Sequence, residues 1–361
     1  MKINFIDLQK QYQEYKSEID RQMQEVLDSS SYINGSKVKE LEEELAKFCG
    51  AKHAIACSSG TDALLLALMA LGIKEGDEVI TTPFTFIATA EMIAFIGAKP
   101  VFVDIDEKTY NIDVTKIEEA ITPKTKAIMP VSLFGQISNM DEINTIAKKH
   151  NLKVIEDGAQ SFGAEYKGKR SGNLSDIGTT SFFPAKPLGC YGDGGAVFTN
   201  SDELAYDMRV LLNHGQTKRY VHTKIGFNGR LDTIQAAVLL AKLKHYEDEI
   251  AKRQEIAKKY SENLKGVTVP YIEPNNLSVW AQYCIRVDNR DKVLQKCKDN
   301  GVPTGVYYPI PLHLQEVFNY LGYKEGDFPI SERVSKDIMA LPMSAFLTQQ
   351  EQEYIIGVMN G

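Results

Sequence analysis

The chain has 361 residues, of which 43% are hydrophobic and 25% charged, and its formal net charge is -7. This length exceeds what one hydrophobic core usually serves, so we expect a large domain and a smaller one. The acidic balance argues against a nucleic-acid-binding protein with an overall basic surface, although small anionic ligands need only local donors.

The cysteines and the N-terminal residues bear on where in the cell the protein is expected. The cysteines are widely spaced and form no CxxC pair: Cys49, Cys57, Cys190, Cys284 and Cys297. This pattern favours reduced thiols in a cytoplasmic protein over disulfides or a metal site. Residues 1–20 lack the apolar core of a secretory signal, and the longest apolar stretch, ALLLALMALGI, is too short to span a bilayer. We therefore expect a cytoplasmic protein without a membrane partner.

After an N-terminal helix, the chain alternates strand-like and helix-like patterns. The predicted strands are AIACSS (54–59), DEVITTP (77–83), KPVFVDI (99–105), KAIMPVSLFG (126–135) and KVIED (153–157). The predicted helices between them are residues 61–73, 87–98, 113–121 and 139–151. Short apolar strands separated by helices predict an α/β protein with a mostly parallel sheet covered on both faces.

Two further strands, 177–183 and 194–200, follow with no room for a helix between them, and Lys186 lies in their connection. A long helix over 231–264 is predicted to lead out of the large domain. Beyond it we expect strands at 268–272, 281–287 and 303–308 and helices at 291–300, 330–339 and 348–359. The predicted domains are therefore residues 1–245 and a smaller α+β domain, 246–361.

The segment CSSGTDAL (57–64) carries a strand into a helix through Ser59, Gly60 and Thr61. Free N–H groups at a helix start, together with hydroxyls, form a cradle for phosphate. An ordinary N-cap by Thr61 explains the same pattern. In open α/β sheets, ligands bind beyond the carboxyl ends of the strands, which is where this segment lies.

Two more predicted strand ends carry groups suited to a flat, charged ring. Glu156 and Asp157 end one strand and Gln160 follows; a carboxylate there either caps a loop or faces a protonated ring nitrogen. Phe84 and Phe86 follow another strand, where an aromatic side chain either belongs to the core or covers one face of a ring.

Lys186, between Pro184 and Pro187, completes this set. Taken alone it would be read as a surface lysine. A phosphate cradle, a strand-end acid, an aromatic ring and a strand-end lysine together match pyridoxal 5'-phosphate. This cofactor needs a lysine for its Schiff base, an anion for its pyridine nitrogen and donors for its phosphate.

Six stretches in the same order resemble the DegT/DnrJ/EryC1/StrS family of sugar aminotransferases over nearly the whole chain. They are SSGTDALLLAL, PFTFIATAE, VIEDGAQSFGA, SFFPAKPLGCYGDGGAVFT, GFNGRLDTIQAA and YYPIPLHLQ. The resemblance implies an aspartate-aminotransferase-like fold (fold type I of the pyridoxal-phosphate enzymes), with a large domain and a smaller C-terminal one.

The resemblance also implies individual roles. Lys186 would bind the cofactor as a Schiff base, and Asp157 would face its pyridine nitrogen. Gln160 would lie near the ring hydroxyl and Phe86 would stack on the ring. Ser59, Gly60, Thr61 and Ser181 would hold the phosphate. Asn228 would reach the phosphate of the neighbouring subunit, so two active sites would form at a homodimer interface. Relatives with histidine at the lysine position are sugar dehydratases, so Lys186 favours amino transfer.

The expected reaction moves an amino group from L-glutamate to a nucleotide-linked keto sugar. The chain looks most similar to the branch that acts on UDP-linked 3-oxo sugars, including UDP-2-acetamido-2-deoxy-3-oxo-D-glucuronate. Arg230, Tyr308 and His313 are candidates for contact with the sugar; alternatively, Arg230 forms a structural ion pair and a tyrosine only packs. The other open readings are a 3-oxo-6-deoxyhexose on dTDP, a 4-oxo sugar on UDP or GDP, a dehydratase, and an inactive regulatory relative.

Overall fold

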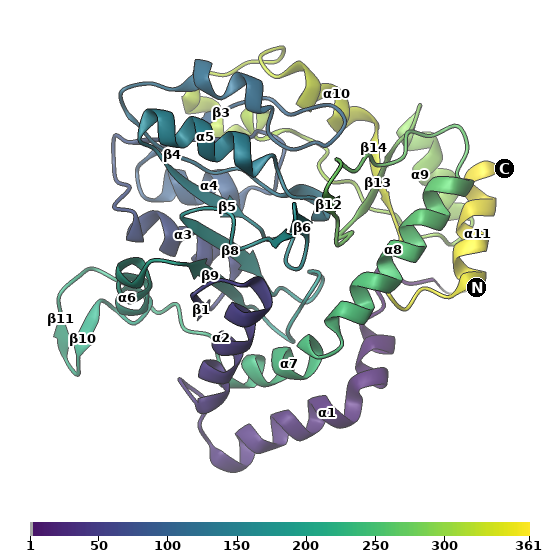
Figure 1. Ribbon diagram of the computed structural model, residues 1–361. Helices are drawn as coiled ribbons and strands as arrows, with labels where there is room; N and C mark the ends of the chain where they lie inside the picture. The colour runs from purple at the N-terminus through teal and green to yellow at the C-terminus, as the bar shows by residue number, and fades with distance from the viewer. Residues whose placement is uncertain (1–2) are drawn as a thin grey trace.

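The computed structural model describes residues 3–361, and its centre is a seven-stranded sheet (Figure 1). In spatial order the strands are β1 (His53–Cys57), β9 (Gly195–Thr199), β8 (Ile177–Ser181), β5 (Lys153–Asp157), β4 (Thr125–Ile128), β2 (Glu78–Thr81) and β3 (Lys99–Phe102). Only β9 runs antiparallel to its neighbours; the other pairs are parallel. Six strands therefore end at one edge, as the sequence predicts.

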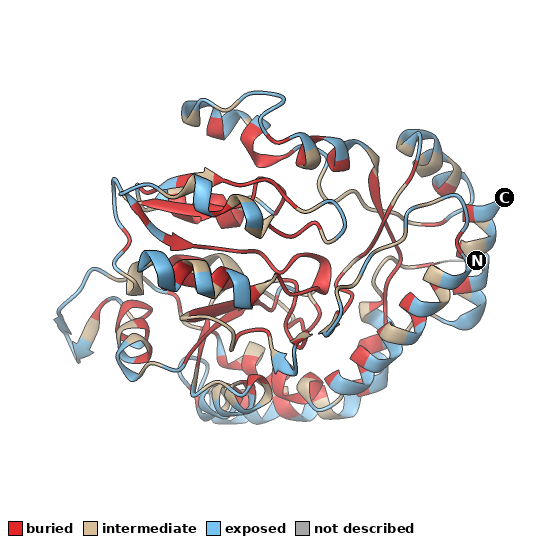
Figure 2. Ribbon diagram, turned by 45° about the horizontal axis from the view of Figure 1, so that its top comes forward, coloured by how far each residue is buried: buried red, intermediate tan, exposed pale blue. Residues whose placement is uncertain are grey.

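Alternating side chains of the strands build a core on each face of the sheet. In β1, Ala54 and Ala56 join one buried cluster, whereas Ile55 joins the other. The first cluster is covered by α2 (Ser36–Cys49), α5 (Met140–His150) and α7 (Thr233–Leu243). The second is covered by α3 (Gly60–Ala70), α4 (Ala88–Phe95) and α6 (Asp202–Leu211). Figure 2 shows buried strands and helices whose outer surfaces are exposed.

The C-terminal part of the chain surrounds a smaller antiparallel pair of strands. It comprises α8 (Tyr246–Asn263), β13 (Tyr283–Arg286), α9 (Arg290–Asp299), α10 (Pro329–Asp337), β14 (Ile338–Leu341) and α11 (Gln349–Asn360). Tyr260, Tyr283 and Ile355 form part of its core, which Ile3 from the N-terminus also joins. Helix α1 (Leu8–Ser29) then runs beside α7 (Figure 1). The domain boundary at residue 245 stays a prediction.

The remaining elements are short. A three-stranded sheet joins β12 (Asn276–Leu277) to β6 (Glu165–Tyr166) and β7 (Lys169–Arg170). A hairpin of β10 (Gln216–Lys218) and β11 (Val221–His222) projects from the body near α6 (Figure 1). The 3-10 helices are η1 (Val114–Lys116), η2 (Glu118–Ala120), η3 (Leu133–Gly135), η4 (Leu312–Leu314) and η5 (Glu316–Leu321).

Two predicted helices are wrong in detail. The helix predicted over 231–264 is broken into α7 and α8 at Lys244 and His245. The His245 ring stacks on Tyr15 of α1 at 4.2 Å between centroids, a tertiary contact at the break. The helix predicted over 113–121 forms only the two 3-10 turns η1 and η2.

The strands predicted at 268–272 and 303–308 do not form. Each segment contributes a single bridge, Thr268 with Arg286 and Gly305 with Ala340. Pro270 has no N–H with which to continue a ladder. The segment 338–339, predicted to end a helix, instead begins β14, whose residues are all buried and pair with β13. Burial between two layers here overrides local helical pattern.

Within residues 3–361, no helix is long and apolar enough to cross a membrane. The five cysteines are free and buried.

Candidate active site

The predicted site residues follow strands that end at the same edge of the large sheet. Gly60 follows β1, Ser181 ends β8, and Asp157 ends β5. Direct contacts bring the groups together: a Cβ on Gly60 would stand 2.5 Å from Ser181 Cβ, and Thr89 Oγ1 donates to Asp157 Oδ2 at 2.8 Å. The edge therefore gathers residues that are up to 121 positions apart in the chain (181 minus 60).

Helix α3 begins with free N–H groups. Ser59 is its N-cap, and Ser59 Oγ accepts a hydrogen bond from Asp62 N at 3.0 Å. The alternative cap by Thr61 is therefore wrong. Gly60 and Thr61 are the first two helical residues, whose N–H groups have no partner within the helix. Their donors, with the positive end of the helix dipole, suit a phosphate group.

Ser181 lies against this helix start and has only 8% of its surface exposed. Ser181 Oγ accepts from Phe183 N at 3.3 Å, so its own hydroxyl proton remains available to another acceptor. Gly60 allows the close approach, because a methyl group there would overlap Ser181. The cradle thus has two backbone donors and one hydroxyl donor.

Asp157 is 3% exposed and accepts from Thr89 Oγ1 at 2.8 Å and from Ala159 N at 3.1 Å. Burial raises the pKa of this carboxyl, whereas the two hydrogen bonds and the nearby charge of Lys186 oppose that rise. A protonated ring nitrogen beside Asp157 would favour the carboxylate in the same way. The geometry therefore suits an anion that faces a cation.

Glu156, its neighbour, points to the other side of the strand and is fully buried. It accepts from Ser132 Oγ at 3.0 Å, Ser171 Oγ at 2.8 Å and Gly172 N at 2.8 Å. Burial raises its pKa despite these donors. Glu156 is a structural carboxylate that ties β5 to the loop after β7.

Lys186 lies in the β8–β9 connection, where its N–H donates to Phe183 O at 2.8 Å in a turn. Burial lowers the pKa of its amine, and the charge of Asp157 opposes this effect. The amine is thus poised toward its neutral, nucleophilic form while close enough to Asp157 to feel its charge.

Phe86, Gln160 and Tyr308 form the side of the site nearest the C-terminal part. Phe86 is 54% exposed, which leaves a ring face free, whereas Phe84 is fully buried in the core. Gln160 accepts from Phe134 N at 2.9 Å and donates through Nε2 to Tyr308 OH at 3.0 Å. The Phe86 and Tyr308 rings lie 6.4 Å apart. Burial raises the pKa of Tyr308, so its hydroxyl stays protonated.

Asn228 and Arg230 lie beside β1. Asn228 is exposed and bridges Asn213, and Arg230 Nη1 donates to Asn213 Oδ1 at 2.7 Å. Arg230 Nε is buried and has no partner among the described residues. The choice between a structural role and a substrate-binding role for Arg230 stays a prediction. The reach of Asn228 to a second subunit stays a prediction.

His313 stands apart from the other site residues. Its side chain has 0% of its surface exposed, its Nε2 lies 3.0 Å from Glu332 Oε1, and its ring packs on Phe328 at 4.7 Å. Burial lowers the pKa of the imidazole against the opposing charge of Glu332. These contacts favour a structural role, and direct contact with a substrate stays a prediction.

The residues present fit pyridoxal 5'-phosphate. The donors at Gly60, Thr61 and Ser181 suit its phosphate, the buried Asp157 suits its ring nitrogen, and the exposed Phe86 suits its ring face. Within residues 3–361, no group of three or more histidine, cysteine or acidic side chains is arranged to hold a metal ion.

Sequence reasoning missed two members of the site. Thr89 orients Asp157, and Thr85 Oγ1 lies 3.1 Å from Thr89 Oγ1. Both lie in PFTFIATAE, but a threonine in the first turn of a helix is too common a feature to signal a contact with a strand 68 residues away. The hydrogen bond between Gln160 and Tyr308 could not be predicted from the sequence either, because it joins distant segments.

Comparison with known proteins decides the family. The model of the DegT/DnrJ/EryC1/StrS aminotransferase family matches residues 13–360. The chain belongs to this family. A UDP-2-acetamido-2-deoxy-3-oxo-D-glucuronate aminotransferase of Pseudomonas aeruginosa is 54% identical over 347 residues, 96% of each chain.

One further similar sequence and one similar crystal structure also match nearly the whole chain. A pleiotropic regulatory protein of Geobacillus stearothermophilus is 48% identical, covering 99% of this chain and 97% of the relative. A crystal structure of NtdA from Bacillus subtilis with bound cofactor PMP superposes with a TM-score of 0.91 at 33% identity, covering 99% and 84% of the two chains. The expected family, enzyme class and fold are confirmed. The protein is a sugar aminotransferase.

Proposed function

We propose that this aminotransferase moves an amino group from L-glutamate to the 3-oxo carbon of UDP-2-acetamido-2-deoxy-3-oxo-D-glucuronate. The observation that carries the amino-transfer chemistry is the half-buried Lys186 in the connection after β8, where its charge acts on Asp157 at the edge that carries the phosphate cradle. The 54% identity to the Pseudomonas aeruginosa enzyme supports this substrate. The product would be an amino sugar for surface polysaccharide or glycan synthesis in the cytoplasm.

The cofactor is pyridoxal 5'-phosphate, which supplies an electron sink for the carbon that loses its proton. Gly60, Thr61 and Ser181 would hold its phosphate, together with Ser59 at the start of the cradle. Asp157 would keep the ring nitrogen cationic through a charge-assisted hydrogen bond. Gln160 would orient the ring hydroxyl, and Phe86 would cover one ring face.

Lys186 would move the proton. Burial lowers the pKa of this amine and so favours the neutral form, in which Nζ can take a proton and return it at an adjacent atom. The charge of Asp157 opposes this lowering of the pKa.

Arg230 would bind the uronate carboxylate. It is the partly buried cation beside β1 whose Nε lacks a partner among the described residues. Arg230→Gln should raise the KM for the sugar about tenfold and leave the half-reaction with glutamate unchanged. Arg209→Gln is the matched control, because Arg209 lies near the same strand but pairs with Glu42 at 2.8 Å. An equal effect of both variants would contradict the assignment. Tyr308 would contact the sugar from beside Phe86.

We also propose a homodimer with shared sites. Asn228 is exposed, and the projecting hairpin of β10 and β11 carries Tyr220, 79% exposed, while Ile225 beyond it is 90% exposed. Mixing the inactive variants Lys186→Ala and Asn228→Ala should restore one intact site per mixed dimer. Verified mixed dimers without activity would show that Asn228 works within its own subunit.

The substrate is tested with the absorbance of the bound cofactor. The holoenzyme is treated with L-glutamate, freed of amino acid, and divided among three sugars: the UDP-linked 3-oxo-glucuronate, a dTDP-linked 3-oxo-6-deoxyhexose and a UDP-linked 4-oxo sugar. Glutamate should change the spectrum, and only the first sugar should restore it. If only another sugar restored the original spectrum, the proposed substrate would be wrong. A spectrum that ignores every amino donor would favour a dehydratase or a regulatory protein.

A further inference from the structure

The connection between β8 and β9, residues 182–194, is called the lysine loop here, because it carries Lys186. It contains no helix or strand, and its own main-chain bonds include those from Lys186 N to Phe183 O and from Cys190 N to Phe182 O. Side chains from the helices behind it supply bonds to its main chain. These bonds belong neither to the cofactor cradle nor to the predicted substrate contacts.

Arg253 of α8 makes the contact nearest to the lysine. Its Nη1 and Nη2 both donate to Pro187 O at 3.3 Å. Pro187 directly follows Lys186, so this carbonyl is one residue from the lysine. Arg253 is 8% exposed, which shields the contact from water. A displacement of Pro187 would therefore move Lys186 with it.

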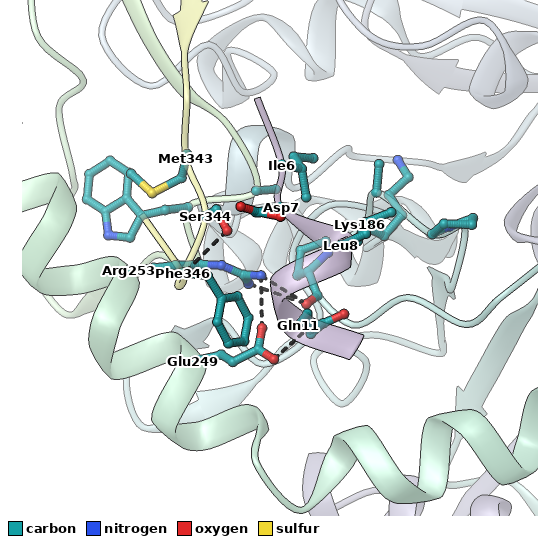
Figure 3. A pocket seen from close by; sticks show the side chains of 15 residues that line it. Ile6, Asp7, Leu8, Gln11, Lys186, Glu249, Arg253, Met343, Ser344 and Phe346 are labelled. Carbon is teal, nitrogen blue, oxygen red and sulfur yellow. Dashed lines mark hydrogen bonds and ion pairs between the residues drawn. The ribbon is translucent and has the colours of Figure 1, made fainter. Parts of the chain in front are cut away.

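Glu249 holds Arg253 in place. It is 1% exposed, accepts from Arg253 Nη2 at 3.3 Å and accepts from Gln11 Nε2 of α1 at 2.8 Å. Figure 3 shows this chain of contacts from Gln11 through Glu249 to Arg253, and the amine of Lys186 pointing away from it. Arg253 therefore has no direct access to the reacting amine.

Helix α7 adds three further bonds to the lysine loop, one of which runs from Gln235 Nε2 to Tyr191 O at 3.4 Å. Lys242 Nζ donates to Gly189 O, and Gln235 Oε1 accepts from Tyr191 N at 2.8 Å. Lys242 is 1% exposed. The main chain is thus held at three places within five residues, 187–191, all on the C-terminal side of Lys186.

A contribution to the stability of the fold does not by itself explain why Arg253 and Glu249 are buried behind the loop. Taking an ion pair out of water costs free energy that its attraction often fails to recover, and apolar residues of the same size frequently stabilise a core as well or better. A charged pair does provide directional hydrogen bonds at defined places. A reactive group needs a defined position, because a displacement of about 1 Å lowers the reaction rate by as much as about 100-fold.

We propose that Arg253, held by Glu249, is a positioning residue for Lys186, which it places through the carbonyl of Pro187. The proposal rests on the proposed function of Lys186 as the lysine that bonds the cofactor. It predicts that loss of Arg253 harms bond formation at Lys186 more than it harms the phosphate cradle, because the cradle lies on β1 and β8 rather than on this part of the loop.

The test uses Arg253→Met and Arg253→Lys in the full chain, with Lys258→Met as matched control. Lys258 lies on the same helix, is exposed and, among residues 3–361, pairs only with Glu262. Two properties of the cofactor-free protein are measured. Calorimetry gives the affinity for pyridoxamine 5'-phosphate, which occupies the cradle but cannot bond to Lys186. Borohydride trapping with peptide mass spectrometry gives the rate at which pyridoxal 5'-phosphate attaches to Lys186.

We expect Arg253→Met to slow attachment at Lys186 about tenfold, with the pyridoxamine 5'-phosphate affinity nearly unchanged. Arg253→Lys, with one ammonium in place of two Nη donors, should slow it less. An unchanged attachment rate in either folded variant, or an equal loss in both measurements, would overturn the proposal. If Arg253→Met does not fold, Arg253→Lys alone decides. Failure of the unmodified protein to label Lys186 would instead overturn the role of Lys186.

Discussion

The two sides of the lysine loop differ in how their polar groups are satisfied. In front of the loop, the N–H groups of Gly60 and Thr61 and the hydroxyl proton of Ser181 remain available to a ligand. Behind it, Arg253 and Lys242 are committed to main-chain carbonyls. The front is therefore suited to bind a ligand, and the back is suited to hold the main chain of the loop in place. The two sides differ in whether their donors still lack an acceptor, more than in the types of residue they contain.

Glu156 and Asp157 show the same difference within one strand. Glu156 accepts from three donors, whereas Asp157 accepts from two and lies close enough to Lys186 for the charge of the lysine to oppose the rise in its pKa. Both are buried carboxylates with a raised pKa. Substitutions on the front should therefore impair catalysis directly, and substitutions of Glu156 or Lys242 should impair stability.

The largest effect is expected at the centre of the front. Lys186→Ala should lower kcat by about 1,000-fold or more, because it removes the amine that would move the proton. Steady-state kinetics with glutamate and the preferred keto sugar measure the loss. The exposed Lys258→Met serves as control and should keep full activity. Substantial turnover in folded Lys186→Ala protein would remove this residue from the mechanism.

Asp157→Asn should lower kcat about 100-fold, because an amide cannot balance a cationic ring nitrogen as a carboxylate does. Thermal unfolding should change only modestly, because the amide oxygen can still accept from Ala159 N, and the Thr89 hydroxyl can rotate to accept from the amide nitrogen. The kinetics of the holoenzyme, together with its melting temperature, measure both effects. A stability loss without a catalytic loss would assign Asp157 to the structural side of the comparison.

Glu156→Gln should show the reverse pattern. Its amide nitrogen cannot accept the bonds that one carboxylate oxygen now accepts, so we expect the free energy of unfolding to fall by about 1–3 kcal/mol. The kcat of the folded protein should be almost unchanged. Urea unfolding measures the first quantity. A loss of kcat as large as that of Asp157→Asn would show that both carboxylates serve the site.

The smallest effect concerns Lys242 behind the loop. Burial lowers the pKa of its amine to about 8 from the ordinary value of 10.5. Between these values the unfolded chain binds more protons than the folded one, so this group stabilises the fold increasingly as pH rises and loses that contribution as pH falls through 8.

The gain in the free energy of unfolding from pH 8 to pH 10 should be about 1–2 kcal/mol larger in the unmodified protein than in Lys242→Met. The difference between the two proteins removes the contributions of buried cysteines and tyrosines, which titrate in both. Urea unfolding at the two pH values gives the result. Parallel pH profiles would mean that Lys242 stays charged in the fold.

Much of the front could be predicted from local sequence. SSGTDAL, VIEDGAQ and SFFPAKP each place a functional group directly after an apolar strand, and parallel strands bring their ends to one edge. The resemblance to a family then supplied roles that no single stretch contains. The partner of Asp157, Thr89, was missed because hydrogen-bond pairing across 68 residues leaves no local pattern.

The sequence by itself determined the alternation of strands and helices, the strand-end groups and the lysine between two prolines, since these follow from periodicity and neighbouring residues. Only the tertiary structure decided that 231–264 breaks at His245, that 338–341 is a strand, and that His313 is enclosed. It also decided that Arg253 bonds the carbonyl next to Lys186. Burial and pairing between distant segments determine these features, and neither is encoded in a short stretch of chain.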